Sequence, residues 1–320
     1  MNNQRSETKP RLILGTMTFG GQTEEREAGE MVRVFLESGN RDLDTAYIYM
    51  DGKTEEILGH IIKRMKRDTF GIATKVHPRV DGSLRPESVN KQLETSLSRL
   101  GLESVDLLYL HSPDPKTPIE ITLEEMNRLH RKGLFRELGL SNYPSWEVAH
   151  IWHTCRSRDW IVPTVYQGMY NALTRDVEPE LFPCLRRLGM RFYAYNPLAG
   201  GLLTGKYHGF REAPNEGRFL RSMYRDRYWK DSYFSALDAL AEACGQHGIS
   251  LTSASLRWLS NHSLLDGDSG DGIILGASRM SHLEENLERC SEADLPEDVV
   301  ERFETAWDTV RPLCSKYFRP

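Results

Sequence analysis

The chain has 320 residues, of which 39% are hydrophobic and 27% charged, and its formal net charge at pH 7 is -5. This composition is typical of a globular chain long enough for one α/β barrel or two ordinary domains. The negative balance argues against nucleic-acid binding, which would need a basic stripe. No apolar run approaches the ~20 residues that a membrane helix needs.

The cysteines and the first residues indicate the compartment. Five scattered cysteines without a CxxC pair are typical of reduced thiols in a cytosolic protein rather than of a disulfide scaffold. The polar start MNNQRSETKP lacks the apolar core of a signal peptide. We therefore expect a cytoplasmic protein with no nucleic-acid or membrane partner.

Short apolar runs recur about every 30 residues in most of the chain, which is the length of one βα unit. We expect strands at residues 11–17, 40–45, 70–75, 105–111, 135–141, 163–167, 190–196 and 272–277. Amphipathic helical patterns lie between them at residues 24–39, 86–101, 118–133 and 144–158. Pro86 is suited to a first helical turn, and Gly39 and Gly101 are suited to helix ends.

Strands that alternate with helices predict a parallel sheet, and about eight such units predict a closed barrel. The competing open, doubly wound sheet usually carries GxGxxG after its first strand, and GTMTFGG at residues 15–21 is not that motif. We therefore predict one (β/α)₈ TIM-barrel domain over residues 1–320.

The interval between the seventh and eighth strands is much longer than an ordinary βα loop. It contains NPLAGGLLTGKY, the segment RSMYRDRYWKD at residues 221–231, and helical patterns at residues 234–246 and 251–259. At the catalytic face of a barrel, such an enlarged loop indicates a ligand clamp. After the eighth strand we expect a helix to about Cys290, another at residues 296–310, and a tail, residues 311–320, over the active-site face.

Four residues at or just beyond strand ends form a proton-transfer set: Asp44, Tyr49, Lys75 and His111. An ammonium beside Tyr49 would lower the pKa of the phenol, and Asp44 would hold Lys75 charged. His111 would orient a substrate carbonyl. For any single residue, a buried salt bridge or a bystander aromatic is the better interpretation. Barrel active sites lie at the strands' carboxyl ends, so the set of four favours catalysis.

Other strand ends carry amide, hydroxyl and aromatic groups. Ser141, Asn142 and Gln167 would suit a neutral amide ligand such as a nicotinamide carboxamide, but Ser and Asn could equally cap helices. Tyr195, followed by Asn196 and Pro197, offers a flat face for a ring, although a buried core tyrosine is more common.

Two further segments could meet phosphate. Residues 200–206, GGLLTGK, approximate a phosphate-binding loop, but Tyr207 stands where that loop has its magnesium-binding Ser or Thr. We exclude nucleotide hydrolysis and keep backbone contacts to a pyrophosphate. Ser278 would cap a helix whose N-terminus attracts anions, and Arg279 would add a fork for phosphate. The alternative is a surface arginine on an ordinary capped helix.

A metal site is not expected. His150 and His153 lie three residues apart on one helical pattern, and we expect them to lack nearby carboxylate or thiol partners.

The residues quoted so far resemble the aldo-keto reductase superfamily along nearly the whole chain. Asp44, Tyr49, Lys75 and His111 match that family's catalytic tetrad. The segments LDTAYIYMDGKTEEILG, LSNYPSWEVA and ILGASRMSHLEEN resemble its signatures. PTVYQGMYNALTR, ELFPCLRRLGMRFYAYNPLAGGLLTGKY, YRDRYWK and the terminal YFR resemble the aflatoxin-aldehyde reductase branch, which also reduces succinic semialdehyde.

The resemblance implies a barrel that binds NADPH (or NADP⁺) without a Rossmann domain and reduces aldehydes and dicarbonyls to alcohols, with Tyr49 as proton donor and a homodimer as the assembly. It implies carboxamide contacts from Ser141, Asn142 and Gln167, and ring stacking on Tyr195. The pyrophosphate contacts would come from Asn196, Pro197, Leu198, Gly200, Gly201, Leu202, Gly205, Lys206 and Arg218. The adenosine contacts would come from Ser278, Arg279, His282 and Asn286. The substrate pocket would be lined by His111, Asn142, Tyr224, Arg227 and Arg319.

The chain departs from the family's pattern in two places. Many relatives carry a second basic residue around the adenosine phosphate, so the expected NADPH preference depends mostly on Arg279. The loop from Arg218 to Tyr224 is shorter than in close relatives, which changes the pocket.

Two other classes of barrel compete with the reductase. A non-catalytic barrel, like the reductase-related β subunits of potassium channels, would keep the nicotinamide site; YRDRYWK and the YFR tail weigh against it. A retaining glycosidase needs two carboxylates at strand ends about 5 Å apart. His111 and Asn196 stand at those positions instead, which excludes it.

Overall fold

Eight parallel strands close into a barrel in simple sequence order, β1 to β8. A computed structural model describes residues 8–211 and 217–319 of the chain. The strands are β1 Arg11–Gly15, β2 Asp42–Asp44, β3 Gly71–Val76, β4 Val105–Leu110, β5 Phe135–Ser141, β6 Pro163–Met169, β7 Arg191–Tyr195 and β8 Gly272–Gly276. All eight expected strands and the closed (β/α)₈ barrel are confirmed.

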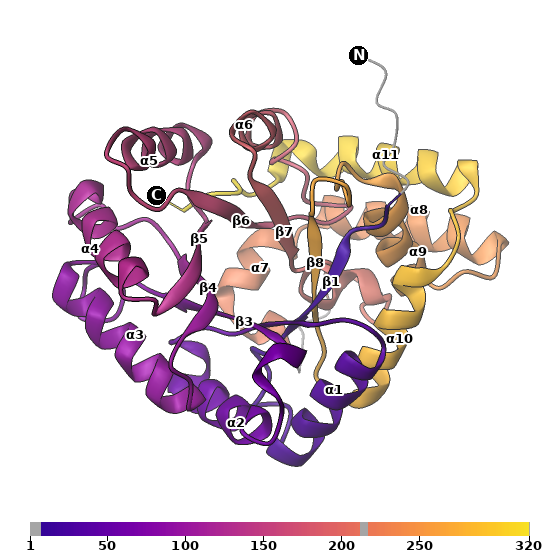
Figure 1. The fold of residues 1–320 in the computed structure, drawn as a ribbon. Helices are drawn as coiled ribbons and strands as arrows, with labels where there is room; N and C mark the ends of the chain where they lie inside the picture. Colours follow the sequence, from indigo (N-terminus) through magenta and orange to yellow (C-terminus); the bar gives the residue numbers. More distant parts are fainter. Residues whose placement is uncertain (1–7, 212–216, 320) are drawn as a thin grey trace.

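Helices surround the strands as a ring (Figure 1). Those that follow the first six strands are α1 Glu25–Glu37, α2 Lys53–Ile62, α3 Pro86–Leu100, α4 Ile119–Arg131, α5 Ser145–Ser157 and α6 Leu181–Leu188. The four helical patterns are confirmed to within a few residues. Gly101 takes a left-handed φ of 65° where α3 ends, a conformation that glycine adopts without steric cost.

The side chains inside the barrel follow from the alternation of a strand. Ala73 and Lys75 on β3 point the same way, as do Leu107 and Tyr109 on β4, because successive side chains face opposite sides. Ile13, Ala73, Leu107, Tyr109, Val165, Tyr193 and Ile274 form one apolar cluster. The same alternation brings the polar residues at the strand ends to one mouth, above this cluster.

The interval between β7 and β8 folds into several short elements. It contains the short helices η3 Ala199–Thr204 and η4 Arg218–Leu220, then α7 Ser222–Tyr228, α8 Asp231–Gln246 and α9 Leu251–Arg257. The arginine- and tyrosine-rich segment is thus mostly α7. Figure 1 shows α7 inside the outline of the helix ring rather than as part of it.

The chain ends over the barrel. After β8 come α10 Met280–Ser291 and α11 Glu297–Val310, and α11 packs beside α8 (Figure 1). The tail then returns to the loops after β5. The backbone N–H of Arg319 donates to the Asn142 carbonyl at 2.9 Å, and the Ser145 N–H donates to the Tyr317 hydroxyl at 3.0 Å. The expected tail over the active-site face is confirmed.

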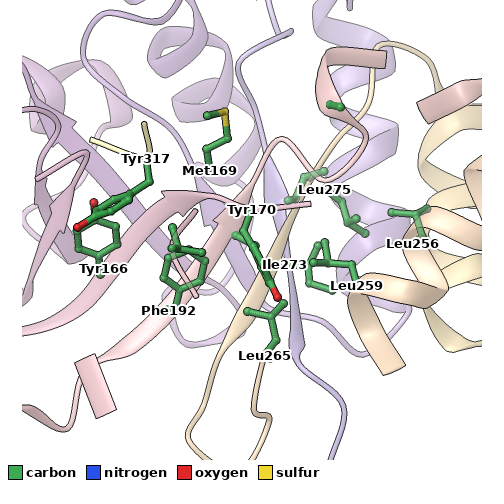
Figure 2. Packing of buried hydrophobic residues seen from close by; sticks show 14 of the residues in the cluster. Tyr166, Met169, Tyr170, Phe192, Leu256, Leu259, Leu265, Ile273, Leu275 and Tyr317 are labelled. Carbon is green, nitrogen blue, oxygen red and sulfur yellow. The ribbon is translucent and has the colours of Figure 1, made fainter. Parts of the chain in front are cut away.

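Aromatic packing fixes the outer face of the last strands. Tyr166 and Phe192 stack with ring centroids 5.9 Å apart, and Figure 2 shows Tyr317 of the tail beside Tyr166. Ile273 and Leu275 of β8 lie in the same buried cluster as Leu256 and Leu259 (Figure 2). The tail is therefore anchored to the barrel wall that carries the β5 and β6 strand ends.

None of the helices found within residues 8–211 and 217–319 combines the length and the apolar character needed to span a bilayer.

Candidate active site

A fully buried ion pair lies at the centre of the barrel mouth. Lys75 Nζ is 2.5 Å from Asp44 Oδ1 and donates to the Thr45 carbonyl at 2.7 Å. Burial on its own would lower the pKa of Lys75, but the Asp44 carboxylate and the Tyr49 phenol outweigh it, and the net pKa is raised. Lys75 therefore carries its charge at neutral pH.

The segment after β2 carries Tyr49 over this pair. The Tyr47 N–H donates to the Lys75 carbonyl at 3.2 Å, so the chain runs beside β3 before it turns at Tyr49. Lys75 Nζ donates to the Tyr49 hydroxyl oxygen at 3.4 Å and lies 5.0 Å from the ring centroid. The hydroxyl proton of Tyr49 is thereby left to point away from the lysine.

The pKa of Tyr49 is raised above its usual value. Burial is the largest cause; Lys75 opposes it and Asp44 adds to it. The expectation that the neighbouring ammonium brings the phenol's pKa below its ordinary value is therefore wrong for the free site, although the contribution of Lys75 has the expected sign. A raised pKa keeps the phenol protonated, which is the form a proton donor needs.

Arg99 of α3 holds the segment that carries Tyr49. Its Nη1 donates to the Tyr47 carbonyl at 3.2 Å and to the buried Glu55 carboxylate at 3.1 Å. Its guanidinium also lies 4.5 Å from the Tyr47 ring centroid. A Cβ on Gly52 would lie 2.3 Å from Arg99 Cζ, so the glycine is needed for this close approach.

His111 directly follows β4 and lies edge-on to Tyr49, with ring centroids 6.0 Å apart. Burial is the largest cause that lowers the pKa of His111 well below its ordinary value, and the positive charge of Lys75 adds to it. His111 is therefore a neutral imidazole at neutral pH. The four residues expected to form the tetrad lie together.

Gln167 lies inside the barrel and its amide is already engaged. Gln167 Nε2 donates to Asp44 Oδ2 at 2.8 Å, on the carboxylate oxygen that Lys75 does not contact. The strand β6 continues two residues beyond Gln167 to Met169, so Gln167 does not close the strand as expected.

Asn142 connects three parts of the mouth. Its Nδ2 donates to the His111 carbonyl at 2.8 Å and to the Ser141 hydroxyl at 2.9 Å, and its Oδ1 accepts from the Tyr195 hydroxyl at 2.9 Å. Asn142 takes a left-handed φ of 64°, which asparagine tolerates better than most residues. These bonds fix Asn142 and leave its backbone carbonyl to the tail.

The loop after β7 is fixed to α7. Asn196 Nδ2 donates to the Tyr228 hydroxyl at 2.7 Å, and Asn196 Oδ1 accepts from the Gly200 N–H at 2.7 Å. Gly200 has a φ of 72°, and a Cβ there would lie 2.8 Å from the Tyr224 ring. Gly201 has a φ of 100° and open space around a would-be Cβ, and its N–H donates to the Leu198 carbonyl at 2.8 Å.

The other residues expected on this loop differ in exposure. Leu202 and Pro197 are buried and Leu198 and Gly205 are half-buried, whereas Lys206 is exposed, 4.9 Å from the Tyr207 ring centroid. Because the Leu202 side chain belongs to the core, only its backbone could meet a ligand. Arg218 donates to the Tyr224 hydroxyl at 3.4 Å and lies 3.4 Å from where a Cβ on Gly276 would be.

The N-terminus of α10 is capped by a residue that the sequence did not suggest. The Met280 N–H donates to Glu27 Oε1 of α1 at 2.8 Å, and Arg279 occupies the N-cap position without a side-chain cap bond. The expectation that Ser278 caps this helix is wrong, because its hydroxyl pairs with His282 Nδ1 at 3.3 Å instead. Arg279 and His282 are exposed, and Asn286 is buried.

Two arginines approach Tyr195 from different segments. Burial raises the pKa of Tyr195, and the positive charges of Arg227 on α7 and Arg319 in the tail oppose that rise. Tyr224 lies 6.0 Å from the Arg227 guanidinium and is nearly buried. Tyr224, Arg227 and Arg319, which were expected to line a substrate pocket, therefore lie close to Tyr195 or to one another.

His150 on α5 has a carboxylate neighbour. His150 Nε2 lies 3.3 Å from Glu120 of α4, so the statement that neither histidine has a carboxylate nearby is wrong for His150. No group of three or more histidine, cysteine, aspartate or glutamate side chains is placed to hold a metal ion in the described parts of the chain.

Sequence reasoning missed His77, Glu27 and Arg99. His77 directly follows β3 and lies 4.8 Å, ring centroid to ring centroid, from His111, and its place two residues after Lys75 was the signal available in the sequence. Glu27 and Arg99 come from the helices α1 and α3. Nothing in the sequence near the sites they support points to either residue.

Comparisons with known proteins agree with this geometry. The model of the Aldo/keto reductase family matches residues 11–308. Aflatoxin B1 aldehyde reductase member 2 of Mus musculus is 49% identical over 97% of this chain and 88% of its own length. Aldo-keto reductase family 7 member A3 of Homo sapiens is 48% identical over 100% of both chains. Aflatoxin B1 aldehyde reductase member 2 of Homo sapiens is 50% identical over 96% of this chain and 89% of its own length.

Proposed function

The chain belongs to the aldo/keto reductase family and is an oxidoreductase, and from that premise we propose that it reduces aldehydes and dicarbonyls to alcohols with NADPH, using Tyr49 as the proton donor. The observation that carries this proposal is the chain of contacts from Tyr49 to Lys75 and from Lys75 to Asp44 at the barrel mouth. The phenol lies 3.4 Å from an ammonium that is itself paired at 2.5 Å.

The residues at the mouth fit a nicotinamide dinucleotide by their chemistry. Gly201 leaves free space beside the loop at a left-handed φ, which suits a close approach by pyrophosphate, while its own N–H stays bonded to the Leu198 carbonyl. Arg218 and Lys206 from the interval between β7 and β8, and Arg279 from the start of α10, would supply positive charge for the phosphates, in a chain whose net charge is -5. Tyr195 and Asn142 lie at the strand ends where the nicotinamide would bind, whereas Gln167 lies two residues before the end of β6 and donates to Asp44. When bound, the reduced nicotinamide supplies the hydride.

Each group of the tetrad then has one task in carbonyl reduction. The neutral His111 donates a hydrogen bond to the carbonyl oxygen and orients the aldehyde. As hydride adds to the carbonyl carbon, the C=O π electrons move to oxygen, and that oxygen takes the proton of Tyr49. Lys75 stabilises the phenolate that remains, and Asp44 holds Lys75 in place. Such proton donation contributes roughly 10²- to 10⁴-fold in rate.

Substrates with a carboxylate fit this mouth best. The charges of Arg227 and Arg319 both act on Tyr195, and arginine forks bind carboxylates in two-point contacts. The relatives named for an aflatoxin aldehyde support aldehydes as the substrate class. We propose aflatoxin dialdehyde-like dicarbonyls and succinic semialdehyde-like carboxylated aldehydes. A homodimer stays a prediction of the family resemblance, and a cytoplasmic location stays a prediction from the cysteine pattern.

The experiment is a substrate panel with the purified full chain. Oxidation of NADPH and of NADH is followed with a dialdehyde, a semialdehyde and an uncharged aldehyde of the same length. We expect turnover with NADPH and the lowest KM for the carboxylated aldehyde. Binding of NADPH without turnover of any carbonyl compound would contradict the proposal and would favour a non-catalytic barrel.

A further inference from the structure

Two buried imidazoles meet at the barrel mouth, and each has one nitrogen without a partner. His77 is 2% exposed and His111 is 8% exposed. Their ring centroids are 4.8 Å apart, with an angle of 70° between the ring planes. His77 Nε2 and His111 Nδ1 are both enclosed, and neither has a hydrogen-bond partner among the described residues. Because an unpaired buried polar atom is costly, the two atoms require an explanation.

The hydrogen of His77 is assigned to Nε2 by its surroundings. The Arg79 backbone N–H donates to His77 Nδ1 at 3.0 Å, so Nδ1 must be the acceptor nitrogen. A neutral imidazole then carries its hydrogen on Nε2. Burial is the largest cause that lowers the pKa of His77 to about 4, so the ring is neutral at neutral pH.

Gln92 of α3 holds the backbone of His77 on both sides. Gln92 Oε1 accepts from the His77 N–H at 2.8 Å, and Gln92 Nε2 donates to the His77 carbonyl at 3.3 Å. Gln92 is itself fully buried. His77 is therefore a fixed donor group, and its Nε2–H is the one part of the ring that lacks a partner.

His111 requires a hydrogen-bond donor at Nδ1 if it is to carry its own hydrogen on Nε2. A neutral His111 can help a substrate carbonyl only if it carries its hydrogen on the nitrogen that faces the substrate. With the hydrogen on Nδ1, its Nε2 would present a lone pair to the carbonyl oxygen and repel it. The doubly protonated ring, which would avoid this choice, is disfavoured by burial and by the charges of Lys75, Arg79 and Arg319.

We propose that His77 donates its Nε2–H to Nδ1 of His111 and thereby holds His111 in the tautomer that donates from Nε2 to the substrate carbonyl. His77 is in this sense a positioning residue, since it acts through His111. The proposal rests on the proposed function, in which His111 orients the carbonyl.

The distance between the rings suits this bond. Two imidazoles joined by an N–H···N bond of about 3 Å have ring centroids about 5 Å apart. The observed 4.8 Å is close to that separation. The two nitrogens are not hydrogen-bonded to each other in the structure, so the proposed bond requires the His111 ring to turn about χ2 while the Arg79 N–H keeps the His77 ring in place. One bond then satisfies both unpaired atoms. His111 is held from its other side as well, because Asn142 donates to its backbone carbonyl at 2.8 Å.

The tautomer can be read directly by ¹⁵N NMR of the full chain labelled at histidine. The His111 signals are assigned from their loss in a His111→Asn sample. We expect an unprotonated Nδ1 and a protonated Nε2 in His111, and a protonated Nε2 in His77. A protonated Nδ1 in His111 would overturn the proposal. This readout needs no cofactor and no turnover.

Matched variants test the effect on catalysis. His77→Leu removes the donor and keeps an apolar side chain, whereas His77→Gln retains an N–H donor at the position of Nε2. We expect kcat to fall about tenfold in His77→Leu, with the KM for NADPH unchanged, and to recover in His77→Gln. Equal kcat values in His77→Leu and the unchanged chain, or equal losses in both variants, would overturn the proposal.

The two proposals fail in different ways. If the unchanged chain reduces no aldehyde, the proposed function fails, while the His111 tautomer can still be measured. If the chain is active but His111 carries its hydrogen on Nδ1, only the role of His77 fails. Thermal unfolding of each variant shows whether a loss of activity comes from a loss of fold, and in that case the tautomer of the unchanged chain decides.

Discussion

Gln167 donates a hydrogen bond to the one oxygen of Asp44 that Lys75 leaves free, at 2.8 Å. The carboxylate is therefore held from β3 by an ammonium and from β6, on the far side of the barrel, by an amide. The orientation of Lys75, and through it that of Tyr49, depends on this three-residue chain across the barrel. Gln167 thus supports the ion pair whether or not it also meets a ligand.

The first prediction concerns this bond. Gln167→Met should lower the free energy of unfolding by about 1–3 kcal/mol, because it leaves a buried carboxylate oxygen without a donor. Urea denaturation measures the change. Gln167→Glu serves as the comparison and should cost more, since it places a second carboxylate beside Asp44. A Gln167→Met variant as stable as the unchanged chain would show that this bond does not support the pair.

Stability should fall as the pH is lowered through the usual pKa of histidine. The pKa values of His77 and His111 lie below their ordinary values in the folded chain, so the unfolded chain takes up more protons below about pH 6.5. The stabilisation that is present above about pH 6.5 is lost as the pH falls, and for His77 the loss continues down to its folded-state pKa of about 4.

Urea denaturation at about pH 7.5 and about pH 5 measures this loss, and His77→Asn should reduce it by about 2 kcal/mol. The remaining loss belongs to His111 and to other groups. An identical loss in the variant would mean that the pKa of His77 is not lowered in the folded chain.

Arg319 should distinguish carboxylated from uncharged substrates. Arg319→Ala should raise the KM for succinic semialdehyde about tenfold or more, because a charge-assisted hydrogen bond contributes about 1.5–3 kcal/mol. An uncharged aldehyde of the same length is the control and should show a much smaller change. Equal changes in both would show that Arg319 does not contact the carboxylate.

Arg279 should contribute to the choice of cofactor. It is exposed at the start of α10, where Glu27 already caps the helix, so its positive charge is the main local attraction for a 2′-phosphate. Arg279→Ala should reduce the preference for NADPH over NADH about tenfold, as measured by kcat/KM for each cofactor. An unchanged ratio would remove Arg279 from the phosphate site.

The barrel and its tetrad were predictable because both follow from local patterns. The alternation of strands and helices predicted the closed barrel, and the position of Lys75 and His111 at strand ends predicted that they meet at one mouth. Period-two alternation in FGIATK also predicts that Lys75 points inward, toward Asp44.

The other contacts depend on distances in space that no local pattern contains. Glu27 caps α10 from a helix 253 positions earlier in the chain, and Gln167 reaches Asp44 across the barrel. The sign of the pKa shift of Tyr49 was also beyond reach, because it depends on how far burial outweighs the charge of Lys75. Composition and spacing do not determine how deeply a single side chain such as Tyr49 is buried.

The most direct measurement of the central claim is the turnover of Tyr49→Phe beside its affinity for NADPH. The phenylalanine keeps the ring beside Lys75 and removes the hydroxyl group that would donate its proton to the carbonyl oxygen. We predict that kcat falls by roughly 10²-fold or more, while the dissociation constant for NADPH, from fluorescence titration, stays within about twofold. Normal turnover by this variant would contradict the account.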